Sequence, residues 1–371
     1  MHNRARSIDI CGVRLANQHL TNQTLATAAD VVSALGAVQA QDYSGAKWGI
    51  AQRGTAIADT DVEAAISSAR ILRTHVLRPT WHFVAAADIR WLLALTSARI
   101  RASAAHYDRK LGIDEDVRRR SRNILSNALR ERTHLTRSEL GEALAKGGVR
   151  ADGTQRLAHL MIHAELDGLV CSGARRGKQF TYALLDECVP TTKPLERDAA
   201  LNALAGRYFS TRGPATENDF AWWSGLTKAD ARAAVRSVDS LESEVIDGRT
   251  YWFPPMRRPP RKMVVRLLPA YDEYMVSYAD RSASHKKVSP AQVGEKFDFL
   301  GQYVITVNGQ VVGRWNRSVD KRGVGVSLAL LTKVSRDEHT AIERETGRFA
   351  RFLQLPLRVE TTKAKAVIRS L

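Results

Sequence analysis

The chain has 371 residues, 44% of them hydrophobic and 26% charged, and these ordinary values exclude a disordered chain. Lys and Arg total 56 against 39 Asp and Glu, and the resulting net charge of +17 favours a polyanionic partner such as nucleic acid, although an Arg-rich GC-rich genome gives the same balance. No apolar run is long enough for a membrane helix or a signal peptide, and three scattered cysteines (Cys11, Cys171 and Cys188) exclude a disulfide framework, so we expect a cytoplasmic protein.

The first 125 residues predict a group of helices followed by two strands. We expect helices at about residues 30–35, 45–53, 61–69 and 87–96. Residues 71–86 alternate as two strands joined near Arg78 and Pro79. This order is typical of a loose winged-helix unit.

Residues 126–190 give the clearest pattern of the chain. Residues 136–139 (TRSE) form a capping box, so a helix is expected to begin there and to end at the two glycines 147–148. A second helix is expected over about 154–166, and two short strands, at about 169–171 and 180–184, flank a basic loop. Helix, turn, helix and basic hairpin together predict a second winged-helix unit.

Residues 191–258 repeat the pattern without repeating the sequence. A linker over 186–197 precedes a short helix near Thr216, a second helix begins at the cap Thr227, and a hairpin turns at Asp247 and Gly248. Recurrence of one supersecondary unit strengthens the interpretation of each copy.

Residues 259–371 differ from the preceding segments because their pattern predicts mainly strands. Strands are expected at about 263–271 and on both sides of Asn308 and Gly309, the strongest short hairpin signal, and again at 323–331 and 355–360. Ser335 and Glu338 cap a helix that runs to about Leu353. The predicted fold class is therefore α+β: three tandem winged-helix units (1–125, 126–190 and 191–258) and a C-terminal β-rich, barrel-like domain (259–371).

One short segment carries candidate chemistry. If residues 38–43 (VQAQDY) are extended, Gln39 and Gln41 point the same way, and two neighbouring amides can hold one water molecule through complementary donors and acceptors. A solvated turn explains the same spacing. His159 and His163 lie four residues apart on one helix, but no third ligand accompanies them, so we expect no metal and no cofactor.

The chain resembles the winged-helix DNA glycosylases of the AlkZ and YcaQ type in four blocks that follow the family's order. These blocks are residues 38–49 (VQAQDYSGAKWG), 77–84 (LRPTWHFV), 267–282 (LLPAYDEYMVSYADRS) and 308–317 (NGQVVGRWNR). The resemblance implies three winged helices around a C-terminal β domain, and excision of alkylated purines from DNA. The motif is Gln-x-Gln in the AlkZ branch and Gln-x-Asp in the YcaQ branch, so it implies that Gln39 and Gln41 are the catalytic pair. Asp42 lies just outside the motif.

The AlkZ branch resembles self-resistance enzymes that unhook interstrand crosslinks made by azinomycin-like alkylators. A purine alkylated at nitrogen seven is already cationic, so its base departs neutral and needs no general acid. What remains is to position a water on the sugar carbon and to stabilise an oxocarbenium-like state. We therefore expect a monofunctional glycosylase that uses side-chain amides as a water clamp.

The expected DNA contacts are mainly basic side chains in an open cleft, because a crosslinked base cannot enter a deep pocket. The candidates are Lys47, Arg53, Arg78, His82, Arg175, Arg176, Lys178, Arg281, Arg314, Trp315 and Arg317. Each has a plainer interpretation as a solvated charge or a core residue. Tyr271, Asp272 and Arg281 fit either a site or a buried polar network that joins the domains.

Two functional classes remain open on the sequence. The first is a DNA glycosylase that acts, as a wrapping monomer associated with the nucleoid, on duplex DNA carrying alkylated purines or crosslinks. The alternative is a non-catalytic winged-helix transcriptional regulator, a class that usually dimerises on two half-sites. A damage-binding protein without activity is a third interpretation, which the presence of both glutamines disfavours.

Overall fold

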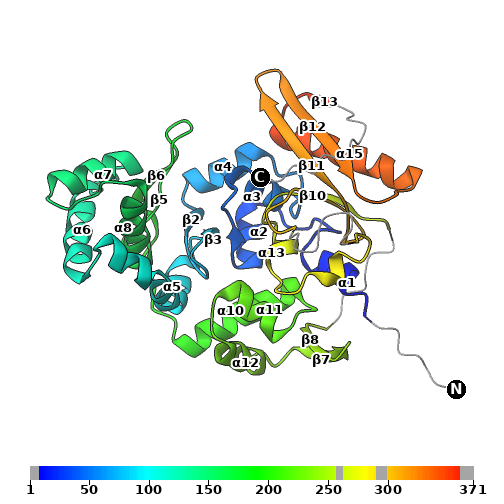
Figure 1. The fold of residues 1–371 in the computed structure, drawn as a ribbon, viewed down its shortest axis with the longest axis horizontal. Helices are drawn as coiled ribbons and strands as arrows, with labels where there is room; N and C mark the ends of the chain where they lie inside the picture. The colour runs from blue at the N-terminus through cyan, green and yellow to red at the C-terminus, as the bar shows by residue number, and fades with distance from the viewer. Residues whose placement is uncertain (1–7, 256–261, 290–298, 360–371) are drawn as a thin grey trace.

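The computed structural model describes residues 8–255, 262–289 and 299–359. It is a mixed α/β structure in which three helix-and-hairpin units are followed by a C-terminal sheet region. Figure 1 shows the second unit at one end of the molecule, the third below the centre and the C-terminal sheet beyond the first unit. Among the described residues, no helix has both the length and the apolar character needed to cross a membrane.

The first unit contains the predicted helices and the predicted strand pair. Its elements are α2 (Ala28–Leu35), α3 (Tyr43–Ala51), α4 (Asp59–Ser67), β1 (Val38–Gln39), β2 (Ile71–His75) and β3 (Trp81–Ala85). The strand order is β1-β3-β2, all antiparallel, so the short strand that carries Gln39 lies beside β3. Before this unit comes α1 (Ile10–Asn17), and after it the long helix α5 (Ile89–Leu111) leads to the second unit.

The second unit confirms the predicted helices and basic hairpin. It contains α6 (Glu115–Ala128), β4 (Leu135–Thr136), α7 (Arg137–Lys146), α8 (Thr154–Leu166), β5 (Val170–Ser172), β6 (Thr181–Leu184) and α9 (Leu185–Cys188). The capping box is present: the Glu139 carboxylate accepts the Thr136 N–H (2.7 Å) and the Thr136 hydroxyl accepts the Glu139 N–H (3.3 Å). Reciprocal bonding of this kind fixes where α7 begins.

The third unit begins with a helix that the sequence analysis did not anticipate, α10 (Arg197–Arg212). It continues with α11 (Glu217–Ser224), α12 (Lys228–Ser237), β7 (Glu242–Ile246) and β8 (Arg249–Phe253). The caps at Thr216 and Thr227 are confirmed. Asp247 and Gly248 have φ values of +50° and +73°, as a tight hairpin turn with the favoured right-handed twist requires.

The C-terminal region forms a five-stranded sheet in the order β13-β12-β11-β10-β9. Its elements are β9 (Val265–Leu268), α13 (Glu273–Val276), the 3₁₀ turn η1 (Ser282–Ser284), β10 (Val304–Val307), β11 (Gln310–Asp320), β12 (Gly323–Leu330), α15 (Arg336–Leu353) and β13 (Leu357–Val359). Within the described ranges β13 and β9 are not paired with each other, so the region is a half-barrel rather than a closed barrel. The Asn308–Gly309 hairpin and the helix capped at Ser335 are confirmed.

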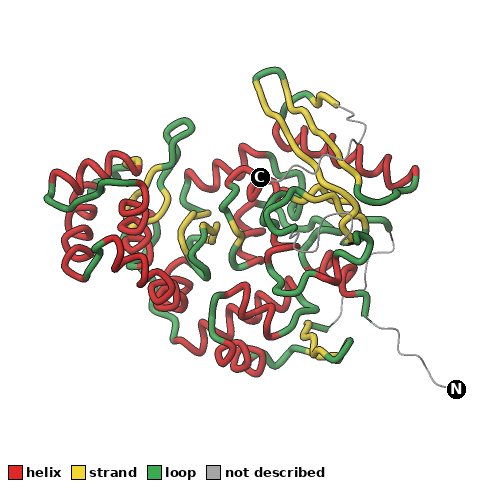
Figure 2. Tube along the Cα trace, viewed as in Figure 1, coloured by secondary structure: helices red, strands yellow, loops and turns green. Residues whose placement is uncertain are grey.

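Shared hydrophobic cores hold the units in fixed positions. One core combines α2–α4 with the C-terminal sheet and α15, and Trp48 packs edge-on against Phe349 of α15 with ring centres 5.2 Å apart. A second combines the first unit's hairpin with α10–α12 and with Leu166 and Cys171 of the second unit. Figure 2 shows how short the strands of the three units are beside the long β11–β12 hairpin. The predicted domain boundary after residue 258 lies outside the described residues.

Candidate functional site

The segment 39–41 is held by its backbone rather than by a regular strand. Gln39 pairs with His82 across β1 and β3. The next residue, Ala40, donates its N–H to the carbonyl oxygen of Trp81 (2.7 Å). The Ala40 carbonyl oxygen accepts Nε and Nη2 of Arg73 at 3.2 and 3.1 Å. Both polar groups of Ala40 are therefore satisfied, which fixes the chain between the two glutamines.

The two glutamines have different surroundings, unlike the side-by-side arrangement expected for an extended segment. Gln39 is 6% exposed, whereas Gln41 lies past the end of β1 and is exposed. The Gln39 Oε1 accepts a hydrogen bond from Arg78 (3.3 Å). Because a guanidinium only donates, this contact identifies the amide oxygen and leaves the Gln39 Nε2 as a donor. Neither that Nε2 nor the Gln41 amide has a hydrogen bond within the described residues.

Glu273, at the start of α13, anchors the same segment from the C-terminal region. It is 1% exposed, and its Oε1 accepts the backbone N–H of Gln39 at 2.8 Å. Its Oε2 accepts from Arg212 (2.6 Å), from the Trp223 indole (3.0 Å) and from the Ser277 hydroxyl (2.9 Å). Burial opposes ionisation, but the charge and hydrogen bond of Arg212 and the Gln39 N–H outweigh it and lower the pKa of Glu273 to about 2. The group is therefore a structural carboxylate at neutral pH.

His82 is fully buried beside this segment, which corrects its prediction as a DNA contact. Its Nδ1 lies 2.9 Å from the Thr80 carbonyl oxygen, so Nδ1 carries the proton and donates. Its Nε2 is buried without a partner in the described residues. Burial, and next the Arg78 charge, lower the pKa of His82 to about 3, so the ring is neutral.

The β2–β3 turn presents Arg78. Leu77 has φ +64°, and the Arg78 N–H donates to the Val76 carbonyl oxygen at 2.7 Å, a three-residue turn with a strained centre. Gly225 supports this turn so closely that a Cβ there would lie 2.2 Å from the Leu77 oxygen. The Arg78 guanidinium reaches Gln39 and lies 5.5 Å from the ring centre of Trp222. Burial lowers the pKa of Arg78.

Three more of the predicted DNA contacts are buried and occupied by other partners, which corrects those predictions. Lys47 is 4% exposed, and its ammonium bonds two carboxylates of α4 at 2.6 and 2.8 Å. Arg53 is 1% exposed and makes a two-pronged pair with Asp272 (2.8 and 2.9 Å). Trp315 is a core residue whose indole donates to the Leu268 carbonyl oxygen. The Arg53–Asp272 pair shows that Asp272 belongs to the buried network that joins the domains.

The other predicted basic contacts keep some exposure and stay predictions. They are Arg78, Arg175, Arg176, Lys178, Arg281, Arg314 and Arg317. Lys178 and Arg176 are exposed on the loop between β5 and β6, and Arg176 pairs with Glu139 at 2.8 Å. Asp42 caps α3 by accepting the Gly45 N–H and also receives the Tyr303 hydroxyl, a structural role beside the Gln segment.

Sequence reasoning missed the two charges that hold the segment, Arg73 and Glu273. Glu273 lies inside the recognised block at 267–282, next to Asp272, so the block was a signal for its importance. Arg73 lies in a strand and gave no signal. His159 and His163, the pair with metal-like spacing, instead hold Asp108 at 2.9 and 3.0 Å, and no metal-ligand cluster occurs among the residues described.

Comparison with known proteins assigns this chain to a family. The model of the family described as DNA glycosylase AlkZ-like matches residues 32–352, most of the chain. The chain belongs to the AlkZ-like DNA glycosylase family. The AlkZ-like chain is 23% identical over 373 residues to an interstrand DNA cross-link repair glycosylase of Streptomyces sahachiroi, covering 93% of this chain and 97% of that protein.

A solved structure shares the fold of this AlkZ-like chain. It is the DNA glycosylase AlkZ of Streptomyces sahachiroi, with a TM-score of 0.76 at 22% identity over 95% of this chain and 98% of that one. Family membership makes the protein a DNA glycosylase, a hydrolase of N-glycosyl bonds, and confirms the resemblance seen in the sequence. It also decides against the non-catalytic regulator.

Proposed function

We propose that this AlkZ-like glycosylase hydrolyses the N-glycosidic bond of purines alkylated at nitrogen seven, with a water held between Gln39 and Gln41. The observation that carries the proposal is the fixed orientation of the Gln39 amide. Since Arg78 occupies its oxygen, the Gln39 Nε2 can donate to the oxygen of a water. The exposed Gln41 supplies an amide oxygen that can accept one of the water's protons.

This arrangement suits a substrate that is activated before it binds. An amide is too weak a base to deprotonate water fully, but it orients a lone pair toward the sugar carbon. The neighbouring titratable groups are poor acids: Glu273 is held as a carboxylate by donors from four residues, and His82 uses its only proton on a carbonyl. A departing base that is already cationic needs no acid, whereas an undamaged purine does, and the genome is thereby protected.

The extension to bulky lesions and crosslinks rests on the relative. The Streptomyces sahachiroi protein is named an interstrand DNA cross-link repair glycosylase, and we propose the same substrate class here, made by a DNA-alkylating natural product of azinomycin type in a self-resistance setting. The three helix-and-hairpin units then act as winged helices that grip duplex DNA. The protein works as a monomer, associated with the nucleoid.

The test is excision from a duplex that carries a single N7-alkylguanine, followed by heating in mild alkali, which cleaves the strand at the abasic site. Gln41→Ala and Gln39→Ala are expected to lower single-turnover excision by about 100-fold, the scale found when a group that positions or stabilises the reacting atoms is removed. A duplex with an N7–N7 crosslink, run in parallel, reports unhooking.

Gln354→Asn is the control, because Gln354 is also an exposed glutamine but lies at the end of α15, outside the three helix-and-hairpin units, and Asn tolerates its φ of +55°. It is expected to excise at the wild-type rate. Full excision by both the Gln39 and the Gln41 variants, with normal folding, would remove the catalytic assignment.

A further inference from the structure

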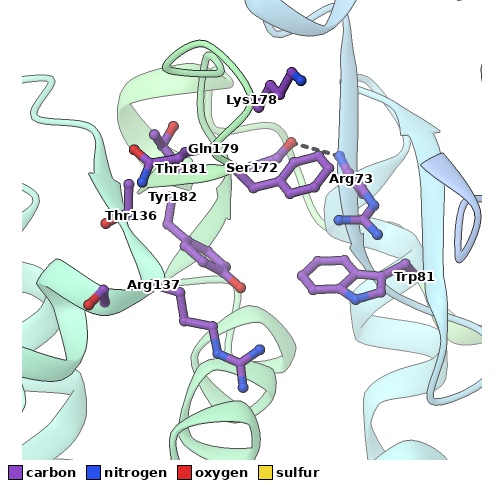
Figure 3. A pocket seen from close by; sticks show the side chains of 11 residues that line it. Arg73, Trp81, Thr136, Arg137, Ser172, Lys178, Gln179, Thr181 and Tyr182 are labelled. Atoms are coloured by element: carbon purple, nitrogen blue, oxygen red, sulfur yellow. Dashed lines mark hydrogen bonds between the residues drawn. The ribbon is translucent and has the colours of Figure 1, made fainter. Parts of the chain in front are cut away.

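A cavity of about 420 Å³ opens between the first and second units, on the other side of the β1–β3–β2 sheet from Gln39. Side chains alternate across a strand, and the pairing puts Gln39 and His82 on one face and Arg73 and Trp81 on the other. Figure 3 shows Arg73 and Trp81 on one side of the cavity and Tyr182 and Arg137 on the other, with Lys178 at the rim. The cavity therefore lies on the face of the sheet opposite to Gln39.

Arg73 is the unusual group in this cavity. It is 8% exposed, and among the described residues it forms no ion pair. Its Nε and Nη2 bind the Ala40 carbonyl oxygen, and its Nη1 makes no hydrogen bond within the described ranges. Burial lowers the pKa of Arg73 to about 10. Glu165 is the carboxylate that opposes this shift, but its Oε2 already bonds the His75 ring at 2.6 Å. A buried cation without a countercharge is costly, so an anionic ligand would stabilise it.

The cavity walls offer flat apolar surfaces around this cation. The guanidinium carbon of Arg73 lies 4.2 Å from the ring centre of Trp81 and 4.7 Å from that of Phe180. Phe180 is 40% exposed, so part of its ring is open to solvent at the cavity. A planar ring that enters the cavity would extend this stack of Trp81, Arg73 and Phe180 or pack against Tyr182, which also lines the cavity.

The polar lining has one sign of charge. Arg73, Arg137 and Lys178 contribute cations, hydroxyl side chains contribute donors, and none of the described lining residues is acidic. Arg137 and Ser138 are the first residues of α7, a ten-residue helix whose free N–H groups there favour an anion. Cations beside stacking surfaces are the combination that recognises an unstacked nucleotide, base and phosphate together.

We propose that this cavity is an accessory site for one unpaired DNA nucleotide, with its base against Trp81 and Phe180 and its phosphate near Arg73 and Arg137. The occupant is a neighbour or the partner of the lesion, because Gln39 lies on the opposite face of the sheet. Arg73 links the two places, since the guanidinium that would meet the phosphate also holds Ala40. The proposal relies on the protein being a DNA glycosylase, and it does not depend on the roles proposed for Gln39 and Gln41.

The test is photo-crosslinking of the full chain to duplexes that contain a tetrahydrofuran abasic analogue, which no glycosylase can cleave. 5-Iodouracil is placed in turn at each position of both strands around the analogue, and crosslinked peptides are identified by mass spectrometry. The expected result is one strand position that crosslinks to Trp81, Phe180 or Tyr182. Crosslinks found only in other peptides would overturn the proposal.

Two variants test whether the cavity residues contribute to DNA affinity, which fluorescence anisotropy measures on the same duplex. Phe180→Ala and Arg137→Met are each expected to weaken binding about ten-fold. The matched controls Tyr107→Ala and Arg119→Met remove an exposed aromatic and an exposed arginine outside the cavity, and are expected to change affinity less than two-fold. Equal affinities for the cavity variants and the wild type would also overturn the proposal.

The Gln41→Ala variant separates this proposal from the catalytic one. It is expected to keep the crosslink to the cavity whatever its effect on excision. Loss of the crosslink in Gln41→Ala, with normal folding, would mean that the nucleotide lies at the glutamines instead, and would contradict an accessory site.

Discussion

Glu273 offers the sharpest test of how the site is held together. Its carboxylate is buried and receives the Gln39 backbone N–H together with donors from Arg212, Trp223 and Ser277. Glu273→Gln keeps the size of the side chain and removes its charge. Arg212, which is fully buried, then loses the only carboxylate with which it forms an ion pair among the described residues.

Two routes give the magnitude of this change. The pKa of Glu273 falls from 4.5 to about 2, and at about 1.4 kcal/mol per unit this favours the folded state by about 3 kcal/mol at neutral pH. Removing one partner of a buried ion pair typically costs about 3–5 kcal/mol. We therefore expect Glu273→Gln to lower the free energy of unfolding by about 3 kcal/mol at pH 7.

The direction in which stability changes with pH follows from where Glu273 binds its proton. Between pH 4.5 and about 2 the unfolded chain binds the proton that the folded Glu273 refuses, so the wild type loses this stabilisation as the pH falls. The gap between wild type and Glu273→Gln should therefore close over that window.

Denaturant unfolding followed by tryptophan fluorescence measures this gap, since Trp223 contacts the carboxylate. Asp116→Asn, which breaks an exposed pair with Arg119, is the control and is expected to leave the free energy of unfolding close to that of the wild type. A gap below about 1 kcal/mol at pH 7, or one that stays constant down to pH 2, would refute the reasoning.

Two further predictions concern the neighbouring turn and histidine. Gly225→Ala puts a Cβ 2.2 Å from the Leu77 oxygen at a φ of +69°, so we expect it to lower the free energy of unfolding by about 2 kcal/mol, measured by thermal unfolding, and to slow excision. Gly206→Ala is the control, because there is open space around Gly206, and it should be neutral or slightly stabilising. The pKa of His82 is about 3 in the folded protein and 6.5 in the unfolded chain, so the unfolded chain binds more protons between these two pH values. The free energy of unfolding therefore falls as the pH drops below 6.5, by up to about 1.4 kcal/mol per pH unit. His82→Gln should remove that slope between pH 6.5 and 4.5 in denaturant titrations; parallel slopes for variant and wild type would contradict the assignment.

The sequence alone determined the local elements, because their signals act over a few residues. The capping boxes at Thr136 and Ser335 placed α7 and α15, and the Asn308–Gly309 pair placed the β10–β11 turn. Family-specific blocks spread over the chain were enough to identify a DNA glycosylase. The assignment of Gln39 and Gln41 as the catalytic pair stays a proposal. The sequence analysis did not predict helix α10.

Only the tertiary structure decided which polar groups meet. Glu273 reaches the backbone of Gln39 from 234 residues away, and Arg78 orients its amide from 39 residues away. Lys47 and Arg53 look like surface charges in the sequence but are buried against carboxylates. A buried charge must find a partner, and the packing of distant segments chooses that partner, so no rule that reads neighbouring residues can supply it.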